Sequence, residues 1–165
     1  MRKIALFFIL ASLMACHENT SLKTGHEGEI VPSFDLLLPD STTHFNTQNI
    51  QAGQPFAILF VGTHCPFSRA ELDDILKNSK SLQNYHFYVL TVEPLQDLKA
   101  LCNDYKFDQY PNFTVGLDYS YFFARHFHDQ AVPYLAVYGG NRRLKEVLQG
   151  STPASEIRVA LEKKD

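Results

Sequence analysis

The sequence predicts an α/β fold with a central mixed β-sheet flanked by helices on both faces. Segments of strand length alternate along the chain with segments whose apolar residues recur at helical spacing. The chain then closes with a hairpin pattern followed by a last helix. Its 165 residues, 45% of them hydrophobic and 20% charged, suit one domain with a sizeable core rather than two domains or a disordered chain.

The first 16 residues indicate export and attachment to a membrane. Basic residues at positions 2 and 3 precede an apolar run, 4–14, that is too short to span a bilayer, because spanning takes about 20 residues. The motif Leu13-Met14-Ala15-Cys16 resembles a bacterial lipobox. This resemblance implies a lipoprotein signal peptide over residues 1–15, cleavage before Cys16 and a lipid on Cys16. The alternative is an ordinary signal peptide that leaves Cys16 as a mature residue.

A tether is predicted between the lipid and the folded domain. Residues 17–30 are polar, contain two glycines and show no apolar period, so residues 16–30 are interpreted as lipidated cysteine plus flexible tether. The folded domain is predicted over residues 31–165. The net charge of −3 argues against a nucleic-acid partner, since proteins that bind nucleic acid usually carry a basic excess.

The first half of the domain is predicted to contain three strands and two helices. A strand over 34–38 is closed by a Pro-Asp turn, and the continuous apolar run 56–62 is typical of a strand buried on both faces. Proline at position 66 fits the first turn of a helix over 66–78. A β-branched and aromatic strand follows over 86–92, and apolar residues at helical spacing predict a helix over 94–105.

The second half is predicted to complete the sheet. Residues 113–115 form a short strand, and the aromatic stretch 119–127 is interpreted as core and rim of the domain rather than a cofactor site. Strands over 134–138 and 144–148 flank a Gly-Gly-Asn turn and form a hairpin. Proline at position 153 opens the last helix, 154–163.

Cys65 is the strongest candidate for a reactive group. It stands where the buried strand feeds a helix, so the unpaired N–H groups and the helix dipole are expected to stabilise its thiolate and lower its pKa. Val132-Pro133 directly precedes a later strand. A cis bond there would leave the backbone of Val132 free to pair with an extended substrate segment.

In combination these features resemble the thioredoxin-like superfamily, and within it the membrane-anchored TlpA/ResA-like thiol–disulfide oxidoreductases. The resemblance covers about residues 30–165 and depends on the order and spacing of several short motifs. These are Pro32-Ser33-Phe34, Thr63-His64-Cys65-Pro66, Arg69 with Glu71, Val132-Pro133, and the hairpin that ends at Gly150. It implies a thioredoxin-like fold, a cis bond before Pro133 and a redox-active Cys65.

The chain departs from the family pattern at the site itself. The family's second cysteine, three residues after the first, is Ser68 here, and the usual tryptophan before the first is His64. A Cys-Pro-Phe-Ser site cannot resolve its own mixed disulfide, because that step requires a second thiol. Ser68 is interpreted either as a hydrogen-bond donor to the Cys65 thiolate or as the remnant of a lost cysteine. His64 is interpreted either as a cation that lowers the pKa of Cys65 or as a cover over the rim of the site.

Three other groups are candidates for a place at the site. Cys102 falls on the apolar stripe of its helix and is predicted to pack in the core, on the face of the sheet opposite Cys65 and beyond the roughly 7 Å that a disulfide bridges. His126 and His128, placed on one side of a strand, are the less favoured alternative for a soft-metal site with Cys65. Arg69 is predicted to be a solvated helix residue. No cofactor and no metal are predicted.

The function predicted from the sequence is single-cysteine thiol–disulfide exchange in the cell envelope, facing the periplasm or the exterior. Protein thiols or disulfides are the expected partners, and an external thiol reductant or redox partner completes the cycle. One alternative is a non-catalytic thioredoxin-fold lipoprotein that binds a partner. The other is a thiol peroxidase, whose signature requires Pro at position 58 and Thr or Ser at position 62, where this chain has Ile58 and Gly62.

Overall fold

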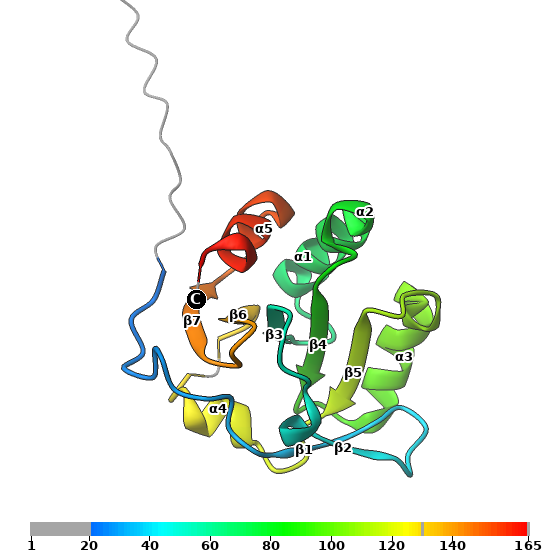
Figure 1. The fold of residues 1–165 in the computed structure, drawn as a ribbon. Coiled ribbons are helices and arrows are strands. Elements are labelled where there is room, and N and C mark those ends of the chain that lie inside the picture. The colour runs from blue at the N-terminus through cyan, green and yellow to red at the C-terminus, as the bar shows by residue number, and fades with distance from the viewer. Residues whose placement is uncertain (1–20, 130, 165) are drawn as a thin grey trace, which may run out of the picture.

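A seven-stranded mixed sheet forms the centre of the molecule (Figure 1). The computed structural model describes residues 21–129 and 131–164. The strands are β1 (Asp35–Leu37), β2 (His44–Asn46), β3 (Phe56–Phe60), β4 (His86–Thr91), β5 (Phe113–Leu117), β6 (Tyr134–Tyr138) and β7 (Leu144–Gln149). The α-helices are α1 (Pro66–Lys77), α2 (Ser79–Leu82), α3 (Leu95–Tyr105), α4 (Phe122–His126) and α5 (Ala154–Glu162), with short 3₁₀ turns η1 (Thr47–Asn49) and η2 (Phe107–Gln109).

The strand order is β2-β1-β5-β4-β3-β6-β7. Strands β3, β4 and β5 run parallel, and the remaining pairs are antiparallel. Every residue of β3 is buried, as expected of a central strand covered on both faces. Its side chains alternate, with Ala57 and Leu59 in one core cluster and Phe56, Ile58 and Phe60 in the other. The predicted α/β fold is therefore confirmed.

The helices divide between the two faces of the sheet. Apolar residues of α1, α3 and α5 join the first core cluster, whereas α4 and the segment 31–50 cover the second. The prediction that α1 and α3 lie on opposite faces was wrong. Because β3, β4 and β5 follow one another in a single direction across the sheet, right-handed crossovers place both helices on the same face. The two helices touch, with the Tyr105 hydroxyl donating to the carbonyl of Arg69 at 3.2 Å.

Three short elements, β2, α2 and α4, were missed from the sequence, besides the 3₁₀ turns. Residues 44–46 form β2, which pairs with β1 in a hairpin. The aromatic stretch holds the helix α4, whose first turn is stabilised by the buried carboxylate of Asp118, since Phe123 N–H donates to Asp118 Oδ2 at 2.8 Å. His126 therefore lies on a helix and His128 follows it with a left-handed φ of 52°, so the predicted strand alternation of these two residues was wrong.

The N-terminal segment 21–31 is bound to the domain rather than free. Leu22 N–H donates to Val147 O at 2.9 Å, and Gly28 N–H donates to Leu144 O at 2.8 Å. Figure 1 shows the segment, in blue, passing alongside β7 and α4. The prediction of a flexible tether was therefore wrong for residues 21–30, because backbone pairing does not depend on the apolar period that the segment lacks. The signal peptide and Cys16 lie outside the described residues.

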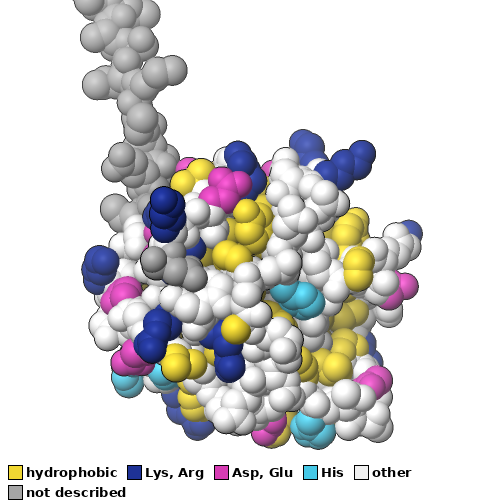
Figure 2. All heavy atoms as spheres, viewed as in Figure 1, with side chains coloured by type: hydrophobic (Ala, Val, Ile, Leu, Met, Phe, Trp, Pro, Cys, Tyr) yellow, Lys and Arg dark blue, Asp and Glu magenta, His cyan; other side chains and the backbone are white. Residues whose placement is uncertain are grey.

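The surface is mixed in character. The face in Figure 2 shows hydrophobic side chains in several separate places among basic and acidic groups. Within residues 21–129 and 131–164, no helix is both long and apolar enough to cross a bilayer. Two of the most exposed large apolar side chains, Phe67 and Tyr121, belong to the loop and helix ends around Cys65.

Candidate active site

Cys65 occupies the N-cap of α1, at the junction that the sequence predicted. Its N–H donates to Gly62 O at 3.1 Å, and its carbonyl accepts from Arg69 N–H at 3.0 Å, which starts the helix. Pro66 takes the first helical position, where its missing N–H costs no hydrogen bond. The thiol is free and partly exposed. A nucleophile held by backbone at the end of a buried strand thus faces solvent.

Gly62 allows the loop to pass close to the thiol. A Cβ at this position would lie 3.0 Å from Cβ of Cys65 and 3.2 Å from Cγ2 of Val132. Both neighbours would have to shift to admit a larger residue. The Thr or Ser that the thiol-peroxidase signature requires at position 62 would therefore need Cys65 and Val132 to move by a few tenths of an ångström.

The second half of the predicted site comes from the loop that leads into the strand β6. The Val132-Pro133 peptide bond is cis, as the family resemblance implied. Cys65 Sγ lies 3.7 Å from Val132 O, in reach of a weak S–H hydrogen bond. The structure thus brings together two residues 67 positions apart, and the carbonyl of Val132 marks the rim of the site.

Ser68 is buried one turn into α1, and its hydroxyl serves two groups. Its Oγ accepts from Gly62 N–H at 3.2 Å. The hydroxyl proton therefore remains available for the sulfur of Cys65, which lies one helical turn before Ser68. Burial raises the pKa of the Cys65 thiol, but hydrogen bonds from the Ser68 N–H, the Ser68 hydroxyl and the Phe67 N–H together lower it below its ordinary value.

His64 and Arg69 act on the loop more than on the sulfur. His64 is 73% exposed, and its Nε2 lies 3.7 Å from Asp97 Oδ1 on α3, a position that favours the rim interpretation. Arg69 was predicted to be a solvated residue. Instead its Nε donates to Thr63 O at 2.8 Å and its Nη2 donates to Asp104 Oδ2 at 3.0 Å. Arg69 therefore ties the loop before Cys65 to α1 and α3.

Glu93 is a site residue that the sequence reasoning missed. Its Oε2 accepts from Thr63 N–H at 2.9 Å and from the Thr63 hydroxyl. Its negative charge raises the pKa of Cys65, in opposition to Ser68. The signal was present in the sequence, because Glu93 comes two residues after the end of β4 and Thr63 three residues after the end of β3, and the carboxyl ends of neighbouring parallel strands share one edge of a sheet.

A cavity of about 260 Å³ opens beside the thiol. It is lined by the ends of β3 and β4, by α4 and by the loop before β6 (Phe60, Val61, Gly62, Thr91, Val92, Glu93, Tyr121, Ala124, Arg125 and Val132). Its walls are mainly apolar, with one carboxylate and one guanidinium. Such a space suits a side chain of an extended segment that pairs at Val132.

Cys102 lies apart from this cavity. It lines a separate one of about 530 Å³ with residues of β5 and the end of β1, and it packs against the first core cluster. Burial raises the pKa of the Cys102 thiol to about 11. The core interpretation of Cys102 is thus supported, although the argument from opposite faces was wrong.

Glu71 is the buried carboxyl that follows Ser68 by one turn on α1. It is 1% exposed, and burial raises its pKa to about 8; the backbone of Thr152 lowers it in part and Asp74 raises it further. Within residues 21–129 and 131–164, no metal-ligand cluster joins Cys65 with His126 and His128, so the less favoured soft-metal alternative gains no support. Among the described residues, clusters with metal-ligand chemistry comprise His64, Glu93 and Asp97, and separately His26, Glu29 and His126.

No protein-family model and no curated protein matches the sequence. Solved structures do superpose on most of it. Peroxidoxin BcpB of Mycobacterium tuberculosis has a TM-score of 0.66 at 14% identity over 82% of this chain and 94% of that one. The chain has the thioredoxin-like fold.

Two further thioredoxin-like structures show the same breadth of similarity. A secreted Mycobacterium tuberculosis disulfide oxidoreductase, described as homologous to DsbE of E. coli, has a TM-score of 0.65 at 16% identity over 78% of this chain and 93% of that one. StoA of Bacillus subtilis has a TM-score of 0.61 at 13% identity over 79% of this chain and 97% of that one. At these identities the similarity is one of fold.

Proposed function

We propose that this protein is a lipid-anchored, thioredoxin-like thiol–disulfide exchange protein that acts on protein thiols of the cell envelope through Cys65 alone. The observation that carries the proposal is the environment of Cys65. It is partly exposed, its pKa is lowered by Ser68 and Phe67, and it faces the carbonyl of Val132. One of the similar structures is a secreted disulfide oxidoreductase, which is consistent with this chemistry.

The exchange begins with attack of the Cys65 thiolate on one sulfur of a substrate disulfide, so a Cys65–substrate disulfide forms while the substrate's own S–S bond breaks and releases a thiolate. In isomerisation, a different thiolate of the substrate attacks the substrate sulfur of the mixed disulfide, so a new substrate disulfide forms and Cys65 leaves as the thiolate, without net oxidation or reduction. In reduction, an external thiolate attacks the sulfur of Cys65 and releases the second substrate sulfur as a thiolate. A second external thiolate then attacks the external sulfur that is joined to Cys65, so a disulfide forms between the two external sulfurs and Cys65 is freed.

Ser68 determines which part of this cycle the chain performs by itself. A hydroxyl stabilises the Cys65 thiolate but cannot attack the mixed disulfide. The intermediate should therefore live longer than in a dithiol site. A buried Cys65 with no groove beside Pro133 would favour the non-catalytic alternative. The thiol is instead partly exposed, and Val132 lines a cavity, so these observations support exchange chemistry.

The chemical part of the proposal is tested by the pKa of Cys65 and by trapping. We expect pH-dependent alkylation of the full chain to give a Cys65 pKa below the ordinary value of about 8.5, and envelope extracts to yield mixed disulfides that Cys65→Ser abolishes. Cys102→Ser is the matched control and should change neither result. A pKa of about 8.5 or above together with no trapped disulfide would contradict the proposal.

Anchoring is tested separately, through Cys16. The motif before Cys16 supports lipidation, so the expressed protein should fractionate with membranes and carry a mass increase on the N-terminal cysteine. Cys16→Ser should move it to the soluble fraction and leave alkylation of Cys65 unchanged. Equal membrane association of both forms would show that the lipobox resemblance misleads.

A further inference from the structure

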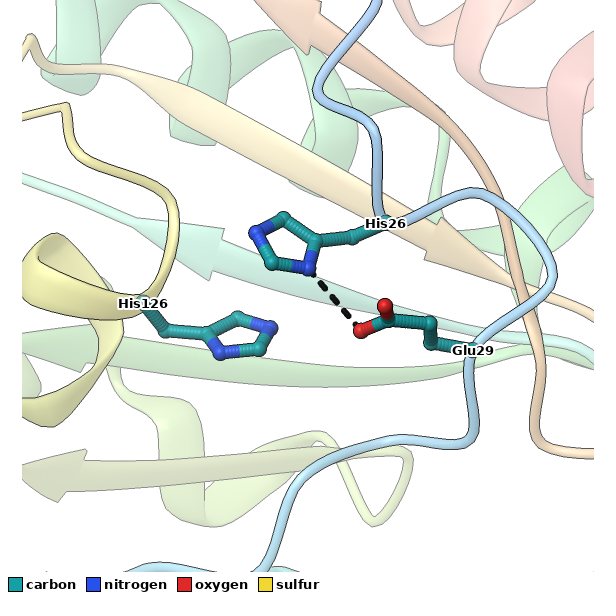
Figure 3. Close-up of side chains that lie close together, drawn as sticks. All are labelled: His26, Glu29 and His126. Atoms are coloured by element: carbon teal, nitrogen blue, oxygen red, sulfur yellow. Dashed lines mark hydrogen bonds and ion pairs between the residues drawn. The ribbon is translucent and has the colours of Figure 1, made fainter.

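Two histidines and a glutamate from distant parts of the chain meet on the face of the sheet away from α1. His26 and Glu29 belong to the N-terminal segment, and His126 is the last residue of α4 (Figure 3). His26 Nδ1 lies 2.9 Å from Glu29 Oε2, and the rings of His26 and His126 are 4.3 Å apart between centroids. One ligand atom from each of the three residues lies within 4.8 Å of the others.

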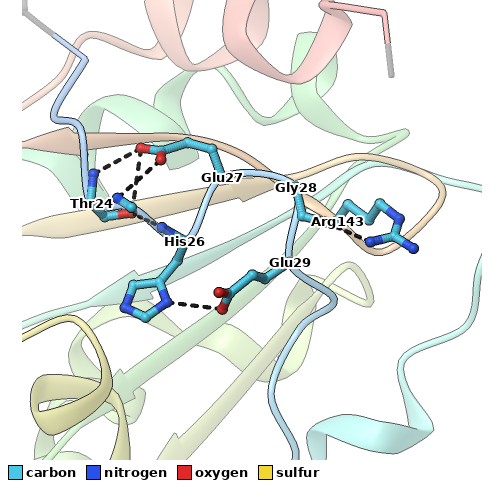
Figure 4. Close-up of polar contacts among 7 residues, drawn as sticks. Thr24, His26, Glu27, Gly28, Glu29 and Arg143 are labelled. Carbon is cyan, nitrogen blue, oxygen red and sulfur yellow. Dashed lines mark hydrogen bonds and ion pairs between the residues drawn. The ribbon is translucent and has the colours of Figure 1, made fainter.

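The turn that carries His26 and Glu29 is held in place by its own hydrogen bonds (Figure 4). Glu27 accepts from Thr24 N–H at 2.8 Å and from Gly25 N–H at 3.1 Å. Glu29 N–H donates to His26 O at 3.0 Å, which brings the two side chains to one side of the turn. The pair is therefore positioned by backbone geometry and does not depend on the His26–Glu29 contact alone.

His126 is positioned independently, from the opposite side. Its ring stacks on Phe122 at 5.6 Å and meets the edge of Phe127 at 4.9 Å, and both aromatic residues pack into the second core cluster. The turn and the end of α4 are thus held in place separately. The side chains that meet between them, His26, Glu29 and His126, can each donate a lone pair to a cation.

We propose that His26, Glu29 and His126 bind one divalent transition-metal ion of the Zn²⁺ class and that this ion clips the N-terminal segment to α4. Two imidazoles and one carboxylate are a ligand set that suits Zn²⁺ and its neighbours rather than Ca²⁺ or Mg²⁺. Ligand atoms around a tetrahedral Zn²⁺ are roughly 3.3 Å apart, so side-chain rotation within the 4.8 Å group closes the site. Water completes the coordination on the exposed side of Glu29.

The other cluster of this chemistry is the weaker candidate. His64 is 73% exposed and contributes the single imidazole of that group. Glu93 Oε2 already accepts two hydrogen bonds from Thr63. An ion there would have to replace the hydrogen bonds between Glu93 and Thr63 that shape the loop before Cys65. At the His26 cluster, an ion would replace at most the contact between His26 and Glu29.

Binding of the ion would have a structural consequence. The segment 21–30 leads toward the proposed lipid on Cys16, and α4 supplies Ala124 and Arg125 to the wall of the cavity beside Cys65. An ion bound to both would link α4 to the N-terminal segment. The cavity wall that α4 forms would then keep its position when the chain that leads to the membrane moves. This inference does not depend on thiol chemistry, and its ligands do not include Cys65.

The test is titration of the metal-free full chain with Zn²⁺ by calorimetry. We expect one ion per chain, and we expect His126→Phe and Glu29→Gln each to weaken binding more than about 10-fold, because loss of even an outer-shell partner typically costs 10–100-fold. His126→Phe keeps the ring packing. His44→Phe replaces another histidine and is the matched control, and it should bind as the wild type does, as should Cys65→Ser.

Co²⁺ in place of Zn²⁺ supplies a second readout. Nitrogen and oxygen ligands should give visible d–d bands without the near-ultraviolet charge-transfer band of a thiolate. If His126→Phe fails to fold, the exposed Glu29→Gln decides the matter. The proposal is overturned by wild-type affinity in the variants that fold, by no bound ion in the wild type, or by binding that Cys65→Ser abolishes.

Discussion

At the scale of single residues, Ser68 links the loop before Cys65 to the ionisation of its thiol. Ser68 Oγ accepts from Gly62 N–H at 3.2 Å, and the Ser68 hydroxyl and N–H oppose the effect of burial and lower the pKa of Cys65. The hydroxyl thus couples the shape of the loop to the charge of the nucleophile. Of the two interpretations drawn from the sequence, the structure favours the donor over the inert remnant.

Ser68→Ala should raise the pKa of Cys65 by about 1 unit, because a hydrogen bond to a charged group is worth about 1.5–3 kcal/mol and the backbone donors remain. The measurement is the pH dependence of Cys65 alkylation. Ser81→Ala, an exposed serine on α2, is the control and should leave the pKa unchanged. An unchanged pKa in Ser68→Ala would assign the stabilisation of the thiolate to the backbone alone.

Cys102 should resist alkylation in the native protein. With a pKa of about 11, only about 0.1% of this thiol is ionised at pH 8, whereas the pKa of Cys65 is lowered. Peptide mapping after brief iodoacetamide treatment should find Cys65 modified at least about tenfold faster, and denaturant should remove the difference. Equal native rates would show that the partly buried helix α3 opens readily.

The sequence identified Cys65, Ser68 and Val132 because each occupies a position defined by local chain geometry: a strand–helix junction, one helical turn beyond it, and the residue before a proline. Glu93 was missed because its role depends on which strand lies beside β3. That neighbour relation is a property of the sheet, not of the residues next to Glu93 along the chain.

At the scale of elements, period and length predicted the long strands and helices, whereas β2, α2 and α4 were missed. β2 has 3 residues and α4 has 5. Each is too short for a strand or helix pattern of apolar residues to repeat twice, so tertiary contacts determine its conformation. The error over the faces of α1 and α3 had a different origin. The handedness of crossovers is fixed, but the face also depends on the direction in which successive strands are added.

The N-terminal segment gives the element-scale prediction. The amides of Leu22, Gly28 and Val31 each donate to a carbonyl of β7 or its preceding turn, at 2.8 to 2.9 Å. We expect their hydrogen exchange to be slowed at least about 10-fold relative to an unstructured chain. Arg143→Ala, which removes the 2.6 Å bond to Gly28 O, should speed exchange in this segment and not in β3.

Exchange of these three amides at unstructured rates in the wild type would restore the flexible-tether interpretation. Intermediate protection that rises when Zn²⁺ is added would instead attribute the docking of the segment to the ion as well as to β7.

At the scale of the whole molecule, the largest electrostatic liability is the carboxyl of Glu71 in the core beneath the site. The native state holds its proton up to a pKa of about 8, whereas the unfolded chain releases it near 4.5. Between these values unfolding releases a proton, so the free energy of unfolding must fall as pH rises. The folded state is therefore favoured at mildly acidic pH and loses this contribution through neutrality.

Glu71→Gln keeps the shape of the side chain and removes the titration. Relative to the wild type, the variant should gain about 3 kcal/mol in free energy of unfolding between pH 5 and pH 8, since each pKa unit corresponds to about 1.4 kcal/mol. Chemical denaturation at several pH values measures it. Glu162→Gln removes an exposed carboxylate on α5 that pairs with Arg158, and its stability curve should run parallel to that of the wild type. A parallel curve for Glu71→Gln as well would mean that the core admits the ionised carboxylate, and that water or backbone donors reach it through the loop at Thr152.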